Sequence, residues 1–374
     1  MTPPALPRPR AAIVYNPTKV DVRRLRSLVE SVEAELSWGP SFWAATTVDD
    51  AGGGQALRLL QASPDVVIAA GGDGTVSAVA QALRHQQVPL GILPVGTTNL
   101  FARALGLPLG NPRRALLAAF SDELRTVDVG RVDALLEGGE TVSAAFLVMT
   151  GMGVDAQMVA NTSSRGKSAF GWVGYIAAIV QSFTRNRQFG LSYTLDGGRA
   201  AVGTAHTLVV GNAGVLPAGI RMIPGALIDD GELDVVLLRP RGARGWHAAI
   251  GWFVRTNTAA LPRRADARAA ATGAEPVMGE FVQHSRAASV SVSVDAPQDF
   301  EIDGEYVGRA VSLEAWIEAE ALTVRGSVAD LRSVARRNGE IASRSQLLTE
   351  MLVTAWRRLV PPPHGPACCL LYTS

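Results

Sequence analysis

The segment VVIAAGGDGTVSAVAQAL, residues 66–83, decides the fold of this chain. Its first part is apolar and β-branched, which predicts a buried strand over residues 65–70, and the spacing of apolar residues over 76–83 predicts a helix. Between them stands Gly71-Gly72-Asp73-Gly74-Thr75, here called the glycine loop. Glycines at a strand-to-helix turn let backbone N–H groups converge on an anion, and the helix N-terminus adds a favourable partial charge. The segment therefore predicts a phosphate-binding turn.

Strands and helices alternate on both sides of the glycine loop. Alternation of this kind is typical of a parallel sheet with helices on both faces. We therefore expect an α/β domain over residues 11–126. Its further predicted elements are strands at residues 11–15, 41–47 and 90–94 and helices at residues 20–36 and 55–61.

The pattern changes near residue 127. From there the apolar segments are short and are separated by glycine or charged turns, which is typical of an antiparallel β-sandwich. We expect this second domain over residues 127–326, then a helical tail over 327–366. Residues 367–374 resemble a translated sequencing adapter and are expected to be foreign to the protein. The predicted strands are residues 142–149, 191–195, 204–210, 233–238, 288–294 and 300–302, and the predicted helical interruptions are residues 168–184 and 246–255.

Composition excludes several classes of protein. The chain has 374 residues, 47% of them hydrophobic and 18% charged, which fits about two folded domains and excludes a disordered chain. Its net charge of +1 gives no reason to expect a nucleic acid partner. The two cysteines, Cys368 and Cys369, are adjacent, which excludes a disulfide scaffold and a cysteine zinc site. No stretch predicts a signal peptide or a transmembrane helix, so we expect a cytoplasmic location.

A second polar turn follows the next predicted strand. It reads Pro94-Val95-Gly96-Thr97-Thr98-Asn99 and is here called the asparagine loop. Turns at the carboxyl ends of neighbouring parallel strands border the crevice in which such sheets bind ligands. Asp73 would repel a phosphate unless a cation lay between them, which indicates a magnesium-bound nucleotide. The alternative is that both turns only begin helices, with Asp73 or Thr75 as an N-cap.

Two acidic turns occur in the sandwich region, Asp229-Asp230-Gly231-Glu232-Leu233-Asp234 and Ile302-Asp303-Gly304-Glu305. Asp-Gly is a strong signal for a tight hairpin turn, and such a turn would present Glu305 at its end. A glutamate serves as general base for a hydroxyl when its geometry and pKa suit that task. The alternative for the second motif is a hairpin turn without a catalytic role, and the alternative for the first motif is a turn that faces solvent.

These motifs resemble the diacylglycerol kinase catalytic-domain family, which includes bacterial lipid kinases and the sphingosine and ceramide kinases. The likeness covers about residues 11–326, and the motifs occur in the family's order. The glycine loop is shared with NAD kinases and phosphofructokinases, whereas the asparagine loop and the Asp-Gly-Glu of the second acidic turn are more specific to the lipid kinases. The motifs that carry the likeness are Asn16-Pro17, the two loops, Val127-Asp128-Val129-Gly130 and the two acidic turns.

The resemblance implies a nucleotide-binding α/β domain and a lipid-binding β-sandwich, with the active site between them. It implies that Glu305 is the general base. It also implies a carboxylate network of Asp73, Asp128 and Asp303 around a catalytic Mg²⁺, and Asp230 resembles a ligand of a second, structural Mg²⁺. The implied contacts of ATP are Asn16, Thr46, Gly72, Asp73, Gly74, Thr75, Gly96, Thr97 and Asn99.

Two positions depart from the family pattern. Thr18-Lys19 replaces the usual Ser-Gly after Asn-Pro, which makes Lys19 a candidate contact of the nucleotide phosphates. An exposed lysine at a helix start is the alternative. Ser77-Ala78 replaces the usual Asn-Glu after the glycine loop, so polar contacts from those two positions are not expected.

The resemblance implies an ATP- and Mg²⁺-dependent kinase of a lipid hydroxyl, with diacylglycerol as the first expectation and phosphatidate as the product. The alternatives are a kinase of sphingoid bases or of another lipid alcohol, and a nucleotide- or lipid-binding module without catalysis. Because the acceptor lies in the bilayer, we expect transient contact with the membrane. The apolar helix at 168–184, with its basic flanks, suits that contact, and a buried helix is its alternative. Association as a homodimer is left open.

Overall fold

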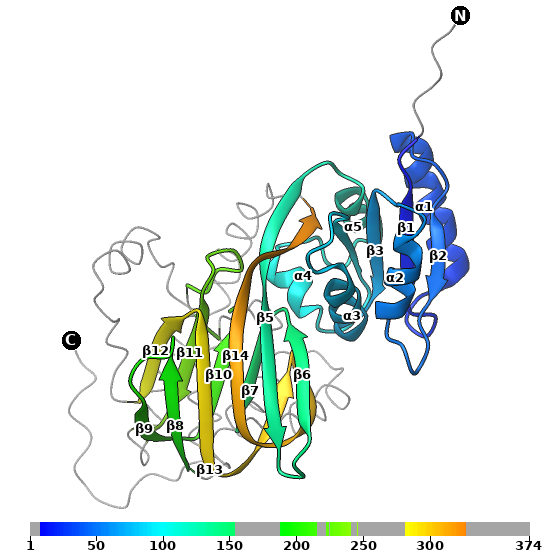
Figure 1. Ribbon diagram of the computed structural model, residues 1–374. Coiled ribbons are helices and arrows are strands. Elements are labelled where there is room, and N and C mark those ends of the chain that lie inside the picture. Colours follow the sequence, from blue (N-terminus) through cyan, green and yellow to red (C-terminus); the bar gives the residue numbers. More distant parts are fainter. Residues whose placement is uncertain are drawn as a thin grey trace, which may run out of the picture.

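The fold was obtained as a computed structural model (Figure 1), and the structure describes residues 8–153, 188–214, 222–223, 225–240, 245 and 281–326. The helices predicted at 168–184 and 246–255, the predicted tail and the adapter-like end lie outside the described residues. Within the described ranges, no helix has the length and apolar character needed to cross a bilayer.

The first part of the chain forms a parallel sheet. Strands β1 (Ala11–Tyr15), β2 (Phe42–Ala45), β3 (Val66–Gly71) and β4 (Leu90–Pro94) lie in the order β4-β3-β1-β2, and each pairs in parallel with its neighbours. β3 is buried along its whole length, as expected of a strand with helices above and below it. The predicted parallel sheet is therefore confirmed.

Helices cover both faces of this sheet. α1 (Val22–Leu36) and α5 (Pro112–Ala119) pack on one face, and α2 (Gly53–Leu60) and α3 (Asp73–Leu83) pack on the other. Side chains alternate along a strand, so Ile13 of β1 joins the core under α1 while its neighbours in β1 join the core under α3. Apolar side chains that repeat every two residues in the strands and every 3.6 residues in the helices thus explain why helices pack on both faces of the sheet.

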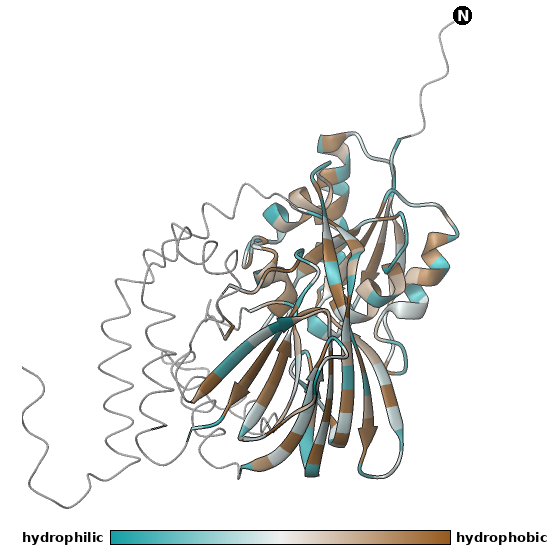
Figure 2. Ribbon diagram, turned by 60° about the vertical axis from the view of Figure 1, so that its left-hand side comes forward, coloured by the Kyte–Doolittle hydropathy of each residue, from teal (hydrophilic) through white to brown (hydrophobic). Residues whose placement is uncertain are grey.

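The later strands form an antiparallel β-sandwich, which lies beside the α/β domain in Figure 1. Figure 2 shows apolar and polar residues alternating along these strands, the pattern expected when one face of a sheet is buried. The strands are β5 (Leu124–Leu136), β6 (Thr141–Phe146), β7 (Met149–Met152), β8 (Phe189–Leu195), β9 (Ala201–Ala205), β10 (Thr207–Gly211), β11 (Leu233–Leu238), β12 (Val282–Ala287), β13 (Ser289–Ile302) and β14 (Glu305–Arg325).

A bend in β13 turns the sheet back on itself. The register of β13 against β14 shifts between Ser293 and Gln298, and β13 pairs with β8 before the shift and with β7 after it. Such irregularities are a usual way to bend a sheet. The two layers enclose a core that includes Phe146, Met152 and Phe300, all fully buried. The predicted sandwich is therefore confirmed.

Several predicted strand boundaries in the sandwich are wrong. Residues 142–149 belong to two strands, because the chain leaves the sheet between β6 and β7, and residues 204–210 are divided between β9 and β10. Residues 288–294 and 300–302 are parts of one strand, β13. The long strand β14 was not expected, because two register shifts against β5 interrupt its alternation.

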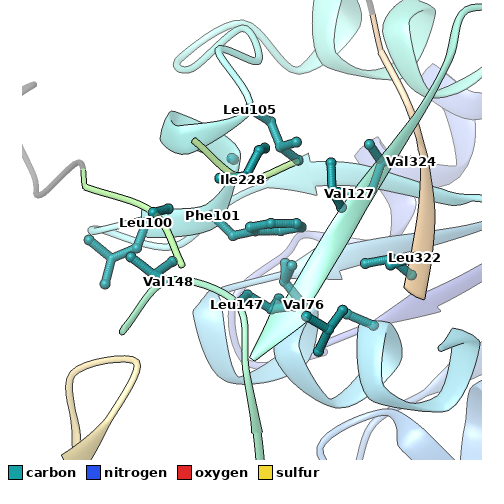
Figure 3. Close-up of a cluster of buried hydrophobic side chains, with 14 of the residues drawn as sticks. Val76, Leu100, Phe101, Leu105, Val127, Leu147, Val148, Ile228, Leu322 and Val324 are labelled. Carbon is teal, nitrogen blue, oxygen red and sulfur yellow. The ribbon is translucent and has the colours of Figure 1, made fainter. Parts of the chain in front are cut away.

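β14 joins the two domains. Near its end, Val324 pairs in parallel with Leu90 of β4, so β14 extends the sheet of the α/β domain. Buried side chains from both domains meet at this junction. Figure 3 shows Val76 of α3 and Phe101 close to Val127 of β5. The two domains therefore share one hydrophobic core.

Asp128 of β5 fixes a distortion of β14 at this junction. The residue is 1% exposed, and one carboxylate oxygen accepts a hydrogen bond from the N–H of Glu320 (2.8 Å). The other oxygen accepts one from the N–H of Gly231 (2.7 Å). Glu320 has a φ of 52°, and the register of β14 against β5 shifts at this point. Asp128 thus holds both the irregularity in β14 and the first acidic turn.

We expect Asp128→Ala to lower the free energy of unfolding by roughly 3 kcal/mol or more, because two backbone N–H groups lose a charged acceptor. Urea denaturation measures the change. Asp49→Ala is the control, because it removes an exposed carboxylate, and we expect it to change stability by about 0.5 kcal/mol at most. Equal effects of the two substitutions would contradict the role given to Asp128.

Candidate active site

The glycine loop and the asparagine loop touch at the carboxyl ends of β3 and β4. Gly71 lies opposite Pro94 in the parallel pair, and the N–H of Val95 donates to the carbonyl of Gly71 (3.1 Å). A Cβ atom added to Gly96 would lie 2.8 Å from the Cα atom of Gly72, closer than real Cβ contacts come. Glycine at position 96 therefore allows the loops to meet at the edge of the expected crevice.

The first turn of α3 has no side-chain cap. Its N-cap residue is Gly72, and no side chain of the described residues accepts a hydrogen bond from the first N–H groups of the helix. The side chain of Thr75 packs against Gly71 instead. Unpaired N–H groups at a helix N-terminus, together with the macrodipole, favour an anion. The alternative in which Asp73 or Thr75 caps this helix is therefore not what the structure contains.

Asp73 ties the two loops together. Its carboxylate accepts hydrogen bonds from the hydroxyl of Thr98 and from the N–H groups of Asn99 (2.8 Å) and Leu100 (2.5 Å). It therefore caps the short helix α4 (Leu100–Ala104). The sequence predicts Asp73 beside a metal-bound phosphate. Because neighbouring donors already use its oxygens, any contact with a metal has to use its remaining lone pairs or a water molecule.

Asn99 shapes the asparagine loop from within. Its side chain accepts a hydrogen bond from the N–H of Gly96 (2.9 Å) and donates one to the carbonyl of Gly96 (2.7 Å). Its φ of 47° lies in the left-handed region, which asparagine tolerates better than most residues. Thr97 is exposed in the same loop. The loop thus leaves the side chain of Thr97 exposed, while Asn99 braces the backbone, and contact of Thr97 with a nucleotide stays a prediction.

The second acidic turn is a two-residue hairpin. Ile302 of β13 pairs with Glu305 of β14, and the two residues between them, Asp303 and Gly304, have φ values of 50° and 84°. Positive φ at both central positions is the type I′ turn that Asp-Gly favours. The carboxylate of Asp303 then accepts backbone hydrogen bonds from the N–H groups of residues 147–149 (2.9, 2.8 and 3.1 Å). The hairpin is thereby fixed to the break between β6 and β7.

Glu305 lies beside the glycine loop. It is exposed, and its Oε1 atom is 3.2 Å from the position that a Cβ atom on Gly74 would take. Glycine at position 74 therefore leaves room for the carboxylate. The structure thus brings the predicted general base, from the sandwich, next to the turn whose N–H groups favour a phosphate, from the α/β domain.

The carboxyl groups of Asp303 and Glu301 are poorly solvated. Burial raises the pKa of Asp303 to about 6, and the charge of Asp73 raises it further, although the three amide hydrogen bonds act in the opposite direction. Burial raises the pKa of Glu301 to about 7, with a further contribution from Asp303. Carboxylates gathered in a poorly solvated place favour a bound cation.

The three carboxylates implied around a catalytic Mg²⁺ do not meet at one point. Asp73 and Asp303 are close enough for the charge of Asp73 to raise the pKa of Asp303. Asp128 instead uses both oxygens to brace the sandwich. Across the described ranges, no three His, Cys, Asp or Glu side chains gather in the manner of a metal site. The structure therefore places Asp73, Asp303 and Glu305 at the site and gives Asp128 a different contact.

Asp230 has a buried carboxylate oxygen that could bind a cation. Its Oδ1 atom accepts a hydrogen bond from the N–H of Glu232 (3.2 Å), whereas Oδ2 is buried without a hydrogen-bond partner among the described residues. Nη1 of Arg286 lies 3.9 Å from that oxygen. Burial raises the pKa of Asp230 to about 6. A buried oxygen without a partner is unfavourable, and a bound cation would satisfy it, so the residue fits the implied structural Mg²⁺.

Asn16, Lys19 and Thr46 lie at the same edge of the sheet, after β1 and β2. The side-chain oxygen of Asn16 accepts hydrogen bonds from the N–H (2.9 Å) and the hydroxyl (2.7 Å) of Thr18, so it shapes its own turn. Thr46 is buried, and its N–H donates to the carbonyl of Tyr15 (2.9 Å). Lys19 is exposed in the turn after Asn16. Their contact with a nucleotide stays a prediction.

Thr98, Arg103 and Glu301 were not expected at the site from sequence. Thr98 supplies the hydroxyl bound by Asp73. Nε of Arg103 donates to the carbonyl of Thr98 (2.6 Å), burial lowers the pKa of the arginine, and the charge of Asp73 opposes that shift. Both residues stand in or just after the asparagine loop, so the loop itself was a signal for them. Nothing in the sequence marks Glu301, because its pKa shift comes from its surroundings.

Comparison with known proteins agrees with this arrangement. A family model described as the diacylglycerol kinase catalytic domain matches residues 10–132, and a model described as the YegS C-terminal NAD kinase beta sandwich-like domain matches residues 147–249. A diacylglycerol kinase of Bacillus subtilis is 26% identical over 304 residues, 80% of this chain and 90% of that protein. A protein of Stenotrophomonas maltophilia named as a YegS-like lipid kinase is 30% identical over 254 residues, 65% of this chain and 73% of that protein.

Solved structures show the same fold. The crystal structure of a diacylglycerol kinase from Bacillus anthracis aligns with a TM-score of 0.58 at 20% sequence identity, and the alignment covers 86% of this chain and 98% of that one. At this level of identity the likeness confirms the fold alone. It agrees with an α/β domain followed by a β-sandwich.

We expect Glu301→Gln to stabilise the protein relative to the unsubstituted chain at pH 8 but not at pH 4. The pKa of Glu301 is raised from its ordinary value of 4.5 to about 7. Below pH 4.5 the group is protonated in the folded and the unfolded states alike, whereas above pH 7 the folded state carries a poorly solvated charge that glutamine lacks. The relative gain on raising the pH is roughly 3 kcal/mol.

Urea denaturation at the two pH values measures this gain. Glu314→Gln removes an exposed carboxylate from the neighbouring strand β14 and serves as the control. A difference between Glu301→Gln and the unsubstituted chain that is the same at both pH values would mean that Glu301 is not destabilised by its surroundings.

Proposed function

The chain belongs to the diacylglycerol kinase catalytic-domain family, and from that premise we propose that it is a lipid kinase that transfers the γ-phosphoryl group of ATP to a lipid hydroxyl, with Mg²⁺. We propose diacylglycerol as the acceptor and phosphatidate as the product. The relatives from Bacillus subtilis and Stenotrophomonas maltophilia are named diacylglycerol kinase and lipid kinase, which supports this class of acceptor.

The position of Glu305 beside Gly74 carries the proposal. Phosphoryl transfer to a hydroxyl needs a turn that holds the phosphates and a carboxylate that accepts the hydroxyl proton, both in one place. The α/β domain supplies the turn, and the hairpin of the sandwich supplies the carboxylate. A module that only bound a nucleotide would have no use for a carboxylate at that position.

In the proposed reaction, Glu305 accepts the proton of the lipid hydroxyl while the hydroxyl oxygen forms a bond to the γ-phosphorus. The bond between the γ-phosphorus and the bridging oxygen breaks, and ADP leaves. The N–H groups at the start of α3 hold the phosphates, and Asp303 keeps the hairpin of Glu305 in place. Such positioning accounts for much of the catalysis of phosphoryl transfer.

Mg²⁺ would supply charge neutralisation for the phosphates. Asp73 and Asp303 are the carboxylates close to the glycine loop, and both already accept backbone hydrogen bonds. We therefore propose that they act on the metal through bound water. We propose a separate structural Mg²⁺ at Asp230, supported by its buried Oδ2 atom without a partner.

The acceptor lies in a bilayer, so the proposed reaction requires contact with the cytoplasmic face of a membrane, where ATP is available. The predicted apolar helix at 168–184, with basic residues on both flanks, is the segment that we propose for this contact.

Transfer of labelled phosphate from ATP into a mixed lipid extract, with Mg²⁺, tests the proposal. Labelled phosphatidate supports both the reaction and its acceptor. A different labelled lipid supports the kinase and corrects the acceptor, with sphingoid bases as the first alternative. No labelled lipid from a folded protein that binds ATP contradicts the proposal and favours a binding module.

We expect Glu305→Gln to lower kcat about a hundredfold or more and to leave the affinity for ATP unchanged, because it removes the proton acceptor and keeps the shape of the side chain. Initial rates of lipid phosphorylation and equilibrium binding of ATP measure the two effects. Glu314→Gln, an exposed position of the same strand, is the matched control. A full rate in Glu305→Gln excludes this residue as the general base.

A further inference from the structure

A cluster of basic side chains lies at the end of α3 opposite the glycine loop. Arg84 is the C-cap residue of α3 and is followed by His85, and Arg131 comes from β5. One carboxylate, Glu318 of β14, stands between them. Nε of Arg84 and Nε2 of His85 each lie 3.2 Å from its Oε2 atom, and Nε of Arg131 lies 3.9 Å from its Oε1 atom. These four residues are here called the junction cluster.

The junction cluster carries more positive than negative charge. Arg84 and Arg131 are both positively charged at neutral pH, and Glu318 offsets one of those charges. A helix C-terminus favours cations, which accounts in part for Arg84. Arg131 stands on a strand and gains nothing from that macrodipole. The cluster therefore keeps an excess of positive charge.

Three nitrogen atoms of the cluster form no hydrogen bond with the described residues. Nε and Nη1 of Arg84 and Nε of Arg131 are buried and donate no hydrogen bond within the described part of the chain, in spite of the ion pairs with Glu318. Buried donors without acceptors are unfavourable and indicate a water molecule or an ion. The cluster is not sealed from solvent, because the side chains of Arg84, Arg131 and His85 are 23%, 16% and 59% exposed.

We propose that the junction cluster binds a phosphate group, as inorganic phosphate or as a phosphate monoester. Two guanidinium groups and an imidazole offer several donors to one tetrahedral oxyanion, and guanidinium groups suit phosphate especially well. α3 has 11 residues and is roughly 16 Å long, so this site is distinct from the glycine loop at its other end. A lipid headgroup and a free phosphate share this chemistry. The inference does not depend on the proposed function.

A phosphate at this place would link the two domains. α3 begins with the glycine loop, and β14 begins with Glu305, so the junction cluster connects later parts of the two elements that build the candidate active site. The N–H of His85 already donates to the carbonyl of Ala321 of β14 (2.7 Å). The proposed anion would add contacts from Arg84 and Arg131 to this existing link.

Titration calorimetry of the full chain with inorganic phosphate tests the proposal. We expect Arg131→Gln to weaken binding about tenfold, because it removes a charge-assisted hydrogen bond. We expect Glu318→Gln to tighten binding, because it removes the carboxylate that competes with the phosphate. Arg309→Gln, which changes an exposed arginine of β14 paired with Glu137, is the control and should leave the affinity unchanged. Phosphate bound at the glycine loop would respond to none of these substitutions.

Sedimentation with phosphatidylcholine vesicles that do or do not contain phosphatidate identifies the source of the phosphate. Binding to phosphatidate vesicles that falls in Arg131→Gln and rises in Glu318→Gln supports a lipid headgroup, and the same response to inorganic phosphate alone supports a free phosphate. The proposal is overturned if neither ligand shows these opposite responses. Circular dichroism checks the folding of each variant, and Arg84→Lys, which keeps the charge but loses the fork of donors, replaces Arg131→Gln if that variant does not fold.

Discussion

Three backbone hydrogen bonds to the carboxylate of Asp303 hold the candidate active site together. They come from residues 147–149, where the chain passes from β6 to β7, and they fix the hairpin that presents Glu305. N–H groups that leave a sheet need another acceptor, and Asp303 provides it. The break in the sheet, the tight turn and the position of Glu305 therefore depend on one another. Burial of the Asp303 carboxyl group raises its pKa, whereas the three amide hydrogen bonds lower it. These hydrogen bonds therefore offset part of the effect of burial.

Asp73 and Asp128 work in the same way as Asp303. Asp73 accepts hydrogen bonds from the asparagine loop and from Leu100 after it, and Asp128 accepts hydrogen bonds from the first acidic turn and from β14. In each case an acidic residue of a motif organises backbone that is distant in sequence. Among the described residues at the two loops, the N–H groups at the start of α3, the side chain of Thr97 and the carboxylate of Glu305 stay available to a ligand. The motifs thus specify the shape of the backbone around the ligand as much as they supply groups to it.

The difference between local signals and long-range contacts explains which features could be predicted from the sequence. The α/β domain was predictable because hydrophobic periodicity and glycine turns are local signals, and the type I′ turn at Asp303 was predictable because Asp-Gly favours it locally. The strand boundaries of the sandwich were not, because long-range contacts set them: Asp303 decides the break at residues 147–149, and Asp128 decides the irregularity at Glu320. The place of Glu301 at the site could not be predicted for the same reason, since burial and the neighbouring Asp303 raise its pKa.

The parallel contact between Val324 and Leu90 has a consequence for how the protein folds. The two residues are about 230 positions apart in the chain, and the entropy of closing so long a loop delays such contacts. Until β14 has paired with it, β4 is an edge strand of its sheet, and unpaired edge strands can pair with other chains. β4 of the α/β domain therefore becomes an inner strand of the sheet only when β14 has paired with it. Two domains that differ in architecture would accordingly gain their full stability together, as one cooperative unit.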